Sequence, residues 1–185
     1  RARARCSPER ALPPAMILRD ARPDDAPALA ALGRDSFRAA FEHLYDPADL
    51  QSFLQSVYDD EAVAREIADS RLLHRLADDG TGLAGFCKIA LDSGFRDHSD
   101  AERPIALSQL YTAPGRTGQG IGASLTAWAL AEARLRGADA VQLSVWAENV
   151  RAQAFYARFG FTKIADIDFW VGNHRDDEFL LELRL

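Results

Sequence analysis

Residues 110–122 read LYTAPGRTGQGIG, and the apolar segment that ends here predicts a strand over 105–112. A helix-like repeat of apolar residues follows over 121–135. Glycines at positions 118, 120 and 122 remove side chains at the helix start, where backbone N–H groups lack intrahelical partners and mark the positive end of the helix dipole. Such a terminus suits a phosphate or pyrophosphate. The alternative is a tight strand-to-helix turn without a ligand.

Two common phosphate-binding motifs can be tested against this turn. A P-loop ends in Gly-Lys-Ser or Gly-Lys-Thr, whereas Gly122 is followed by Ala123 here. A dinucleotide fingerprint needs a third glycine, and Leu125 holds that position of the run beginning at Gly120. That fingerprint also normally follows the first strand of its fold, and this turn lies in mid-chain. Neither motif fits.

Hydrophobic periodicity predicts the other elements outward from this turn. Strands are expected over 17–19, 72–77, 83–91, 141–145, 161–171 and 178–185, and helices over 24–45, 47–57, 62–68 and 149–159. This order indicates a mixed sheet of the α/β or α+β class. The helix after the turn is expected to stop at Gly137 and to bury one face, made of Ile121, Leu125, Trp128, Ala131 and Leu135.

Polar residues mark the helix starts. Asp24 and Asp46 are candidate N-caps, and Pro47 suits the first helical position after Asp46. Asn149 is expected to cap the short helix that follows it. The helical spacing of Phe155 and Phe159 on that helix indicates core positions.

A second motif lies downstream of the turn. Residues 149–161 read NVRAQAFYARFGF, which has the pattern N-x-x-A-x-x-F-Y-x-x-x-G-F. Together the two segments resemble the GNAT superfamily of N-acetyltransferases, whose signature pairs a Q/R-x-x-G-x-G/A turn with such a helix. The second motif is complete, whereas Thr117 stands at the usual Gln/Arg position and Arg116 lies one residue earlier. The resemblance covers about residue 17 to the C-terminus and is most specific over 107–161.

The resemblance implies a mixed, largely antiparallel sheet with flanking helices, whose central strands, 105–112 and 140–147, splay apart. Acetyl-CoA would be the cosubstrate, with its pantetheine lying in the gap like a further strand and its pyrophosphate on the turn. The implied cofactor contacts come from three segments: Leu110, Tyr111, Thr112, Thr117, Gly118, Gln119, Gly120, Ile121, Gly122, Ala123, Asn149, Phe155 and Tyr156.

The resemblance also implies a catalytic role for Tyr156. Acetyl transfer from a thioester expels a thiolate, and a phenolic O–H can protonate or stabilise it. The alternative is simple packing, because aromatic residues at helical spacing usually face a core. The base that deprotonates the amine stays open, with Glu42, His43, Glu148 and an ordered water as candidates.

The N-terminal half resembles one branch of the superfamily more than others. Residues 37–50 carry Phe37, Phe41 and Tyr45 at four-residue spacing, as in the bacterial polyamine (spermidine/spermine) acetyltransferase-like branch, and two short patterns within 169–180 agree. We therefore expect Phe37, Phe41, Glu42 and Tyr45 to line a site for a small-molecule amine. The alternative is a helix face packed in the core.

Charge limits the classes of partner. The chain has a formal net charge of −6. Its first 15 residues hold four arginines and one glutamate, so residues 16–185 carry −9. This balance argues against nucleic acid or an anionic membrane as a partner and is compatible with a cationic substrate. Because no apolar run is long enough to span a membrane, we expect a soluble cytoplasmic protein.

The length of 185 residues suits one domain, which we assign to residues 16–185, with 1–15 as a disordered or artefactual arm. Cys6 and Cys87 lie far apart and the four histidines are scattered, so we predict neither a disulfide framework nor a metal site. A homodimer is left open. Two other functions also stay open: acetylation of protein lysines or N-termini, and non-catalytic regulation by acyl-CoA binding.

Overall fold

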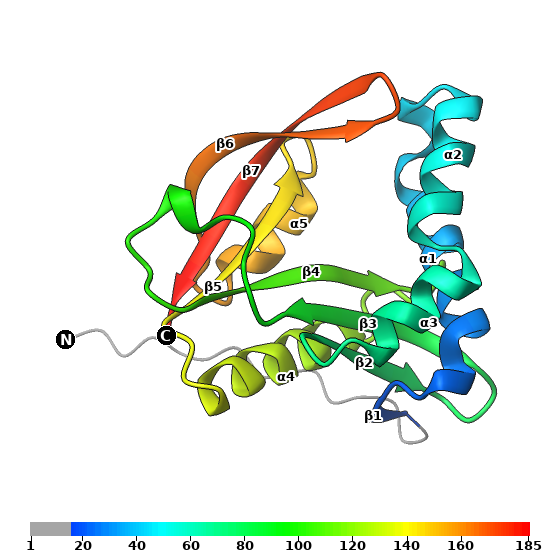
Figure 1. Cartoon of the computed structure of the whole chain (residues 1–185), viewed down its shortest axis with the longest axis horizontal. Coiled ribbons are helices and arrows are strands. Elements are labelled where there is room, and N and C mark those ends of the chain that lie inside the picture. The colour runs from blue at the N-terminus through cyan, green and yellow to red at the C-terminus, as the bar shows by residue number, and fades with distance from the viewer. Residues whose placement is uncertain (1–15) are drawn as a thin grey trace.

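A computed structural model describes residues 16–185, which form a seven-stranded sheet between two groups of helices (Figure 1). The mixed α/β class and the order of the elements predicted from the sequence are confirmed. The elements are β1 (Ile17–Asp20), η1 (Pro23–Asp25), α1 (Ala26–Phe41), η2 (Glu42–Leu44), α2 (Pro47–Val57), α3 (Asp60–Ala68), β2 (Leu72–Asp78), β3 (Leu83–Ala90), η3 (Arg96–His98), β4 (Pro104–Thr112), α4 (Ile121–Leu135), β5 (Ala140–Trp146), α5 (Val150–Ala157), β6 (Thr162–Val171) and β7 (His174–Arg184), where η marks a short 3₁₀ turn.

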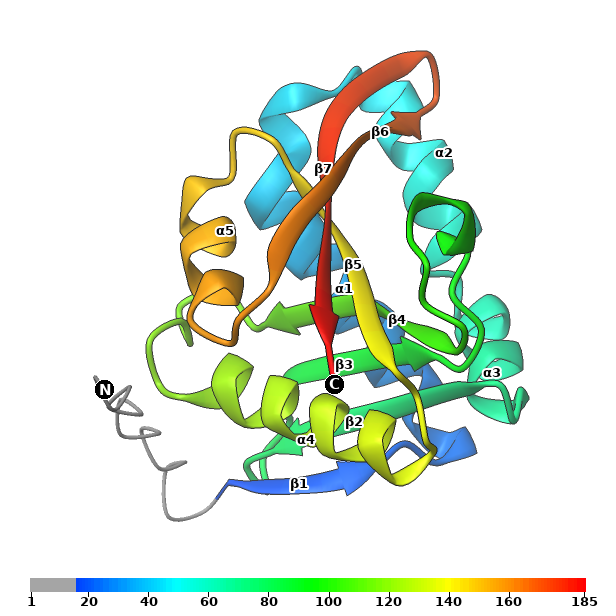
Figure 2. The same cartoon turned by 90° about the vertical axis from the view of Figure 1, so that its left-hand side faces the viewer.

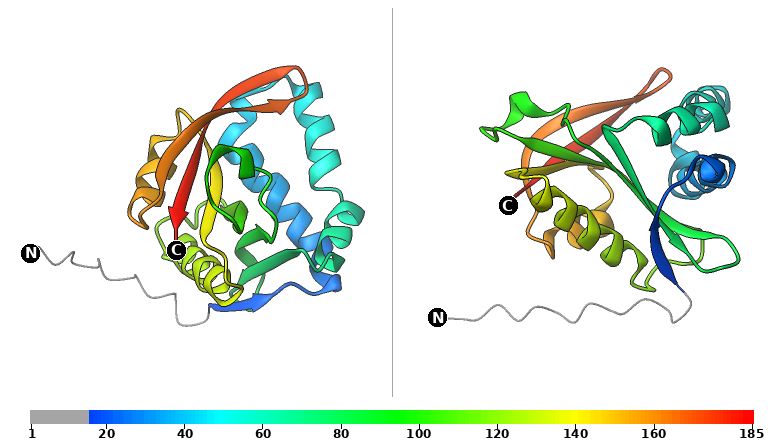
Figure 3. Two further views of the ribbon diagram at one scale, coloured as in Figure 1. Left: turned by 60° about the vertical axis from the view of Figure 1, so that its left-hand side comes forward. Right: turned by 60° about the horizontal axis from the view of Figure 1, so that its bottom comes forward.

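The strand order in the sheet is β1-β2-β3-β4-β5-β7-β6. All neighbouring strands are antiparallel except β4 and β5, which are parallel. Figure 2 shows the sheet as two halves, with β1 to β4 running across the view and β5, β7 and β6 running steeply through it. The right-hand view of Figure 3 shows α4 on one face of the sheet and α1 to α3 on the other.

Each face of the sheet carries its own apolar core. On the first face, Leu125 of α4 and Tyr156 of α5 pack with Val141 and Leu143 of β5. On the second face, residues from α1, α2 and α3 pack against β2 and β3 around Phe86. Burial of large apolar side chains supplies most of the favourable free energy of folding, so both helix groups are held firmly on the sheet.

The predicted buried face of α4 is partly wrong. Leu135 is 81% exposed, and Ala131 is also exposed. The most deeply buried residues of α4 are Ile121, Leu125, Thr126, Ala129 and Ala133, and all but Thr126 follow a four-residue spacing. The helix therefore packs on the sheet along one row of residues spaced i, i+4. Because apolar residues occupy several such rows of α4, the sequence pattern alone does not show which row faces the sheet.

Several predicted element boundaries also need correction. Asp24 lies within the turn η1, and α1 begins after Asp25, whose carboxylate accepts a hydrogen bond from the Arg22 backbone N–H at 2.7 Å. The predicted helix 24–45 ends at Phe41 and continues as η2. The last strand begins at His174 rather than at residue 178, because a tight turn returns the chain directly from β6 to β7.

Gly85 allows α4 to begin directly against β3. A Cβ atom at this position would lie 2.8 Å from Ile121 Cγ2 and 2.8 Å from the backbone oxygen of Tyr111. Gly85→Ala should therefore displace α4 or β4 and lower the free energy of unfolding by about 1–3 kcal/mol. Urea unfolding followed by circular dichroism measures this loss. Gly82→Ala in the neighbouring hairpin turn is the control, because a Cβ atom added at Gly82 would have no atom within 4 Å. Equal midpoints for the two variants would contradict the packing argument.

Candidate functional site

The two central strands of the sheet are paired at one end only. Residues 104–106 pair in parallel with residues 140–142, whereas β4 continues to Thr112 and β5 to Trp146. Beyond this short ladder the strands diverge, as Figure 2 shows, so the predicted splay is confirmed. Residues 110–112 lie on the diverging part of β4, where they remain paired with β3. The edge of β4 that faces β5 has no ladder there.

The glycine-rich turn leads from this diverging end into α4. Gly118 and Gly120 have φ angles of 82° and 84°, in the left-handed region that favours glycine. The Gly120 carbonyl accepts a hydrogen bond from the Ser124 N–H at 3.0 Å, which closes the first turn of the helix. The N–H groups of residues 121–123 therefore belong to the set without an intrahelical acceptor. They lie at the positive end of a 15-residue helix, which fits a pyrophosphate.

The side chains of the turn add little charge to this cradle. Thr117 is exposed. Arg116 forms an ion pair with Asp79 from the β2–β3 turn, and its Nη1 lies 3.5 Å from Gln119 Oε1. Because Asp79 neutralises Arg116, an anion would be held here mainly by backbone N–H groups.

The second motif forms the start of α5. Asn149 Oδ1 accepts a hydrogen bond from the Ala152 N–H at 3.0 Å, which confirms the predicted N-cap. Gln153 Nε2 donates to the carbonyl oxygens of Trp146 at 3.3 Å and Ala147 at 2.8 Å. These bonds fix α5 to the end of β5, beside the diverging strands.

Phe155 and Tyr156 join α5 to the core and to α4. A Cβ atom on Gly122 would lie 3.7 Å from the Phe155 ring, so this ring packs on the first turn of α4. Tyr156 is 8% exposed, and its ring meets that of Phe155 edge-on at 5.1 Å. Burial, with smaller effects from Cys87 and Tyr111, raises the pKa of Tyr156 above its usual range. The phenol is therefore protonated near neutral pH and can act as a proton donor.

The predicted acceptor residues lie on the opposite face, at the end of α1. Phe37 is 4% exposed, and its ring contacts those of Phe41, Tyr45 and Phe53 at centroid distances of 4.8 to 6.0 Å. This position in the core matches the alternative that the sequence left open. Phe41 and Tyr45 are partly exposed and Glu42 is exposed, so these three side chains remain accessible.

Three residues that the sequence analysis missed join this group from β5 and β7. The Trp146 ring lies 6.2 Å from the Phe41 ring. The Tyr45 hydroxyl donates a hydrogen bond to Asp176 Oδ2 at 2.5 Å, and Glu178 lies opposite Trp146 in the β5–β7 ladder. We call Phe41, Tyr45, Trp146, Asp176 and Glu178 the acidic aromatic cluster.

Desolvation and negative charge shift two pKa values in the acidic aromatic cluster. Burial is the main cause that raises the pKa of Tyr45, and the hydrogen bond to Asp176 and the charge of Glu178 add to it. Burial also raises the pKa of Glu178, where the Ser144 hydroxyl opposes the shift and the charge of Asp176 adds to it. Such a partly desolvated anionic environment favours a bound cation.

The candidate bases named from the sequence all lie on the surface. Glu42, His43 and Glu148 are at least partly exposed. The His43 ring lies 6.4 Å from the Trp146 ring, at the rim of the acidic aromatic cluster. Each of these three side chains is therefore in contact with water rather than enclosed in a desolvated site.

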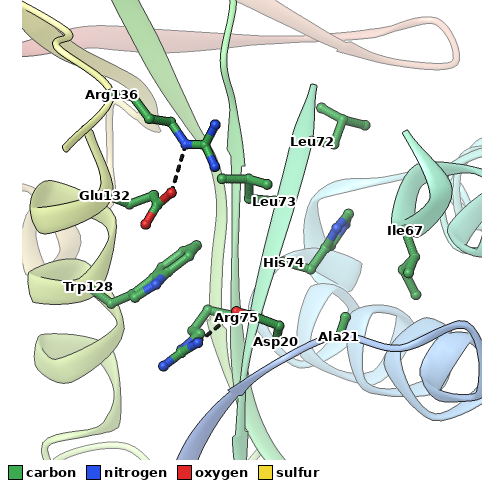
Figure 4. A pocket seen from close by; sticks show the side chains of 10 residues that line it. All are labelled: Asp20, Ala21, Ile67, Leu72, Leu73, His74, Arg75, Trp128, Glu132 and Arg136. Carbon is green, nitrogen blue, oxygen red and sulfur yellow. Dashed lines mark hydrogen bonds and ion pairs between the residues drawn. The ribbon is translucent and has the colours of Figure 1, made fainter. Parts of the chain in front are cut away.

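A cavity of about 300 Å³ lies away from these residues, at the sheet edge beside the end of β1 (Figure 4). Its charged side chains are paired with one another. Arg75 Nη1 lies 2.6 Å from Asp20, and Arg136 Nε lies 2.7 Å from Glu132. Because none of the predicted site residues lines it, we do not assign it to the active site.

Two further expectations concern the chain as a whole. Within residues 16–185, no helix combines the length and the apolar character needed to cross a bilayer. Cys87 is buried, whereas Cys6 and the predicted arm over 1–15 lie outside the described residues.

Known proteins of similar structure carry acetyltransferase names. A paiA N-acetyltransferase from Thermoplasma acidophilum in complex with coenzyme A has a TM-score of 0.74 at 21% identity, covering 92% of this chain and 99% of that one. The ribosomal-protein-S18-alanine N-acetyltransferase of Escherichia coli (TM-score 0.66, 18% identity, 91% and 93% coverage) shares the fold. So does the spermidine/spermine N-acetyltransferase SpeG of Vibrio cholerae (0.61, 20%, 91% and 92%).

Proteins of similar sequence are also named N-acetyltransferases. An uncharacterised N-acetyltransferase encoded in the pepI 3′ region of Lactobacillus delbrueckii subsp. lactis is 27% identical over 162 residues, which is 87% of this chain and 92% of the relative. The sequence profile of the acetyltransferase (GNAT) family matches residues 33–161, which include both motifs. The chain therefore belongs to the GNAT family and is an N-acetyltransferase.

Proposed function

We propose that this enzyme transfers the acetyl group of acetyl-CoA directly to a primary amine of a small cationic molecule, such as a polyamine. The acidic aromatic cluster carries the proposal. It combines the carboxylates of Asp176 and Glu178 with three aromatic rings at the end of β5. An aromatic face attracts an ammonium group by about 0.5–2 kcal/mol, and carboxylates steer cations toward a site.

The proposed acetyl-CoA site uses backbone more than side chains. The N–H groups of residues 117–123 would hold the pyrophosphate, and the edge of residues 110–112 would hold the pantetheine. The left-handed glycines and the missing ladder between β4 and β5 support this assignment. Asn149, Phe155 and Tyr156 would line the same site from α5. Bound there, acetyl-CoA supplies an activated thioester.

Acceptor choice tests the proposal. Polyamines should have a lower KM than amines with neutral tails, and this KM should rise with ionic strength because salt screens the attraction. Glu42→Gln should raise KM for the polyamine by about 1.4-fold to fivefold, since an exposed ion pair contributes about 0.2–1 kcal/mol. The decrease in kcat should be smaller. Free thiol released from acetyl-CoA in the presence of an amine panel measures these constants.

A control variant at a second carboxylate distinguishes the effect of charge near the acceptor site from the effect of the net charge of the protein. Glu61 is exposed on α3, away from the acidic aromatic cluster, so Glu61→Gln should leave KM unchanged. If an amino acid or another anionic amine is the best acceptor at low salt, the polyamine assignment is wrong. Peptides with free lysine or N-terminal amines belong in the panel, because a protein-alanine acetyltransferase shares the fold. Acetyl-CoA binding without thiol release from any amine would instead identify a regulatory binding module.

A further inference from the structure

Glu178 lies beside the end of β5 that is farthest from the β4–β5 ladder. It pairs across β7–β5 with Trp146, the last residue of β5, and across β7–β6 with Ile167. The β4–β5 ladder ends at Ala106 and Gln142, near the other end of β5. Under the proposed function, which this inference assumes, the thioester and the amine meet in this diverging region.

The register determines which face Glu178 occupies. Alternate residues of a strand share a face, so Gln142, Ser144 and Trp146 of β5 lie on the same face as Glu178 and Glu182 of β7. The hydrogen bond from Gln142 Nε2 to Glu182 Oε2, at 2.8 Å, agrees with this. The intervening residues of β5 pack in the core under α4 and α5. Glu178 therefore faces the side of the sheet on which α1 and the predicted acceptor residues lie.

The groups around Glu178 come from three other elements. Asp176 precedes it on β7 and is bonded to Tyr45, which follows η2, while His174 Nε2 lies 3.2 Å from Asp176. Burial is the main cause that raises the pKa of Tyr45 and of Tyr111 on β4, and the charge of Glu178 adds to the shift of both. Ser144 lies on the same face of the neighbouring strand β5, and its hydroxyl opposes the larger effect of burial, which raises the pKa of Glu178.

The Glu178 carboxylate also differs from other partly buried glutamates in having no cationic partner. Glu66 is held by Lys88 Nζ at 2.9 Å, and Glu132 by Arg136 at 2.7 Å. Among residues 16–185, no lysine, arginine or histidine forms an ion pair with Glu178. A carboxylate that is neither neutralised nor fully solvated is available to accept a proton.

We infer that Glu178 is the general base that deprotonates the acceptor ammonium. The carboxylate takes one proton from the R–NH₃⁺ group, and the neutral nitrogen attacks the thioester carbonyl carbon. The C–N bond forms, the C–S bond breaks, and the departing sulfur receives a proton from Tyr156. The nitrogen then loses a second proton, which restores the Tyr156 phenol. Glu178 releases its proton to solvent, so each turnover yields one amide, one thiol and one proton.

Glu178→Gln tests this role because the amide keeps the shape of the side chain and cannot take the proton. Near pH 7, kcat/KM for a polyamine should fall by about 10²–10⁴-fold, the usual contribution of a general base. The Kd of acetyl-CoA should change by less than about twofold, because the cofactor residues are elsewhere. Glu182→Gln is the matched control: it removes a buried carboxylate from the same face of the same strand, and activity should persist.

Two readouts separate a base from a structural residue. In the variant, kcat/KM should rise by about tenfold per pH unit below the pKa of the amine, because only the free amine then reacts. The wild-type value should be flat over the same range. With trifluoroethylamine, which is neutral near pH 7, the two enzymes should differ little. An equal loss at every pH and with both acceptors would overturn the assignment, as would full activity of Glu178→Gln.

Ser144→Ala provides a second test that keeps the carboxylate. The Ser144 hydroxyl lowers the pKa of Glu178, so its removal should raise that pKa. The base must be ionised to act, and the acidic limb of the kcat/KM profile should therefore move to higher pH. An unmoved limb would overturn the assignment.

The failure of the proposed function can be distinguished from the failure of the base. If the wild-type enzyme binds acetyl-CoA but no amine in the panel leads to thiol release, both the proposed function and the base assignment fail. If only the results for the variants disagree, the base assignment fails and the proposed function stands.

Discussion

Replacement of Tyr156 by phenylalanine should lower kcat by about 10²–10⁴-fold, the usual contribution of a positioned general acid. The phenylalanine ring keeps the edge-on contacts with Phe155 and Phe161, at 5.1 and 5.6 Å, so packing is preserved. Only the hydroxyl is lost. Burial keeps that hydroxyl protonated near neutral pH, which suits a group that donates to a departing thiolate.

Single-turnover thiol release measures the chemical step of Tyr156→Phe directly, without interference from product dissociation. The chain has four tyrosines, and Tyr58 lies outside both the motifs and the acidic aromatic cluster. Tyr58→Phe also removes a buried hydroxyl and serves as the control, with kcat expected to stay near the wild-type value. An unchanged single-turnover rate in Tyr156→Phe would reduce Tyr156 to a packing residue.

The second large effect is expected at the glycine-rich turn. Gly120→Glu should weaken acetyl-CoA binding by about 100-fold, which corresponds to about 3 kcal/mol of lost and repulsive interaction with phosphate. Gly120 is the N-cap of α4 with φ of 84°, a conformation that is strained for any L side chain. A carboxylate there also opposes the positive helix terminus that would hold the pyrophosphate.

Calorimetric titration of acetyl-CoA gives the Kd of Gly120→Glu. Gly137→Glu is the matched control, because Gly137 also has a positive φ, of 71°, and lies beyond the other end of the same helix. It should lose stability by a similar amount and keep its affinity. Gly120→Ala separates backbone strain from charge. If Gly120→Glu binds acetyl-CoA as tightly as wild type, the pyrophosphate does not lie on this turn.

The local elements could be predicted because their signals span only a few residues. Asp46 and Asn149 cap their helices through bonds to backbone N–H groups two and three residues ahead, and both caps are present. The turn at 117–122 can be predicted for the same reason, since a left-handed φ and a helix start each depend on adjacent residues. The family resemblance rests on such segments, and the family match includes both.

The buried face of α4 could not be predicted from local sequence patterns. Leu135 has the helical spacing of a core residue, but it is 81% exposed. Ala129 and Ala133 are fully buried, but alanine contributes almost no signal to a hydrophobic pattern. Which row of a helix is buried depends on how the helix crosses the sheet, and that is decided by packing with distant strands.

The acidic aromatic cluster is the clearest product of tertiary structure. Phe41 and Tyr45 stand out in the sequence, but Trp146 and Glu178 do not, because nothing in their spacing reveals that β7 pairs with β5. A shift of one residue in that register would turn the Glu178 side chain to the opposite face. Local propensities therefore determined the elements, their order and the glycine-rich turn. Only the packed sheet, through long-range register and burial, decided which carboxylate lies beside the diverging strands.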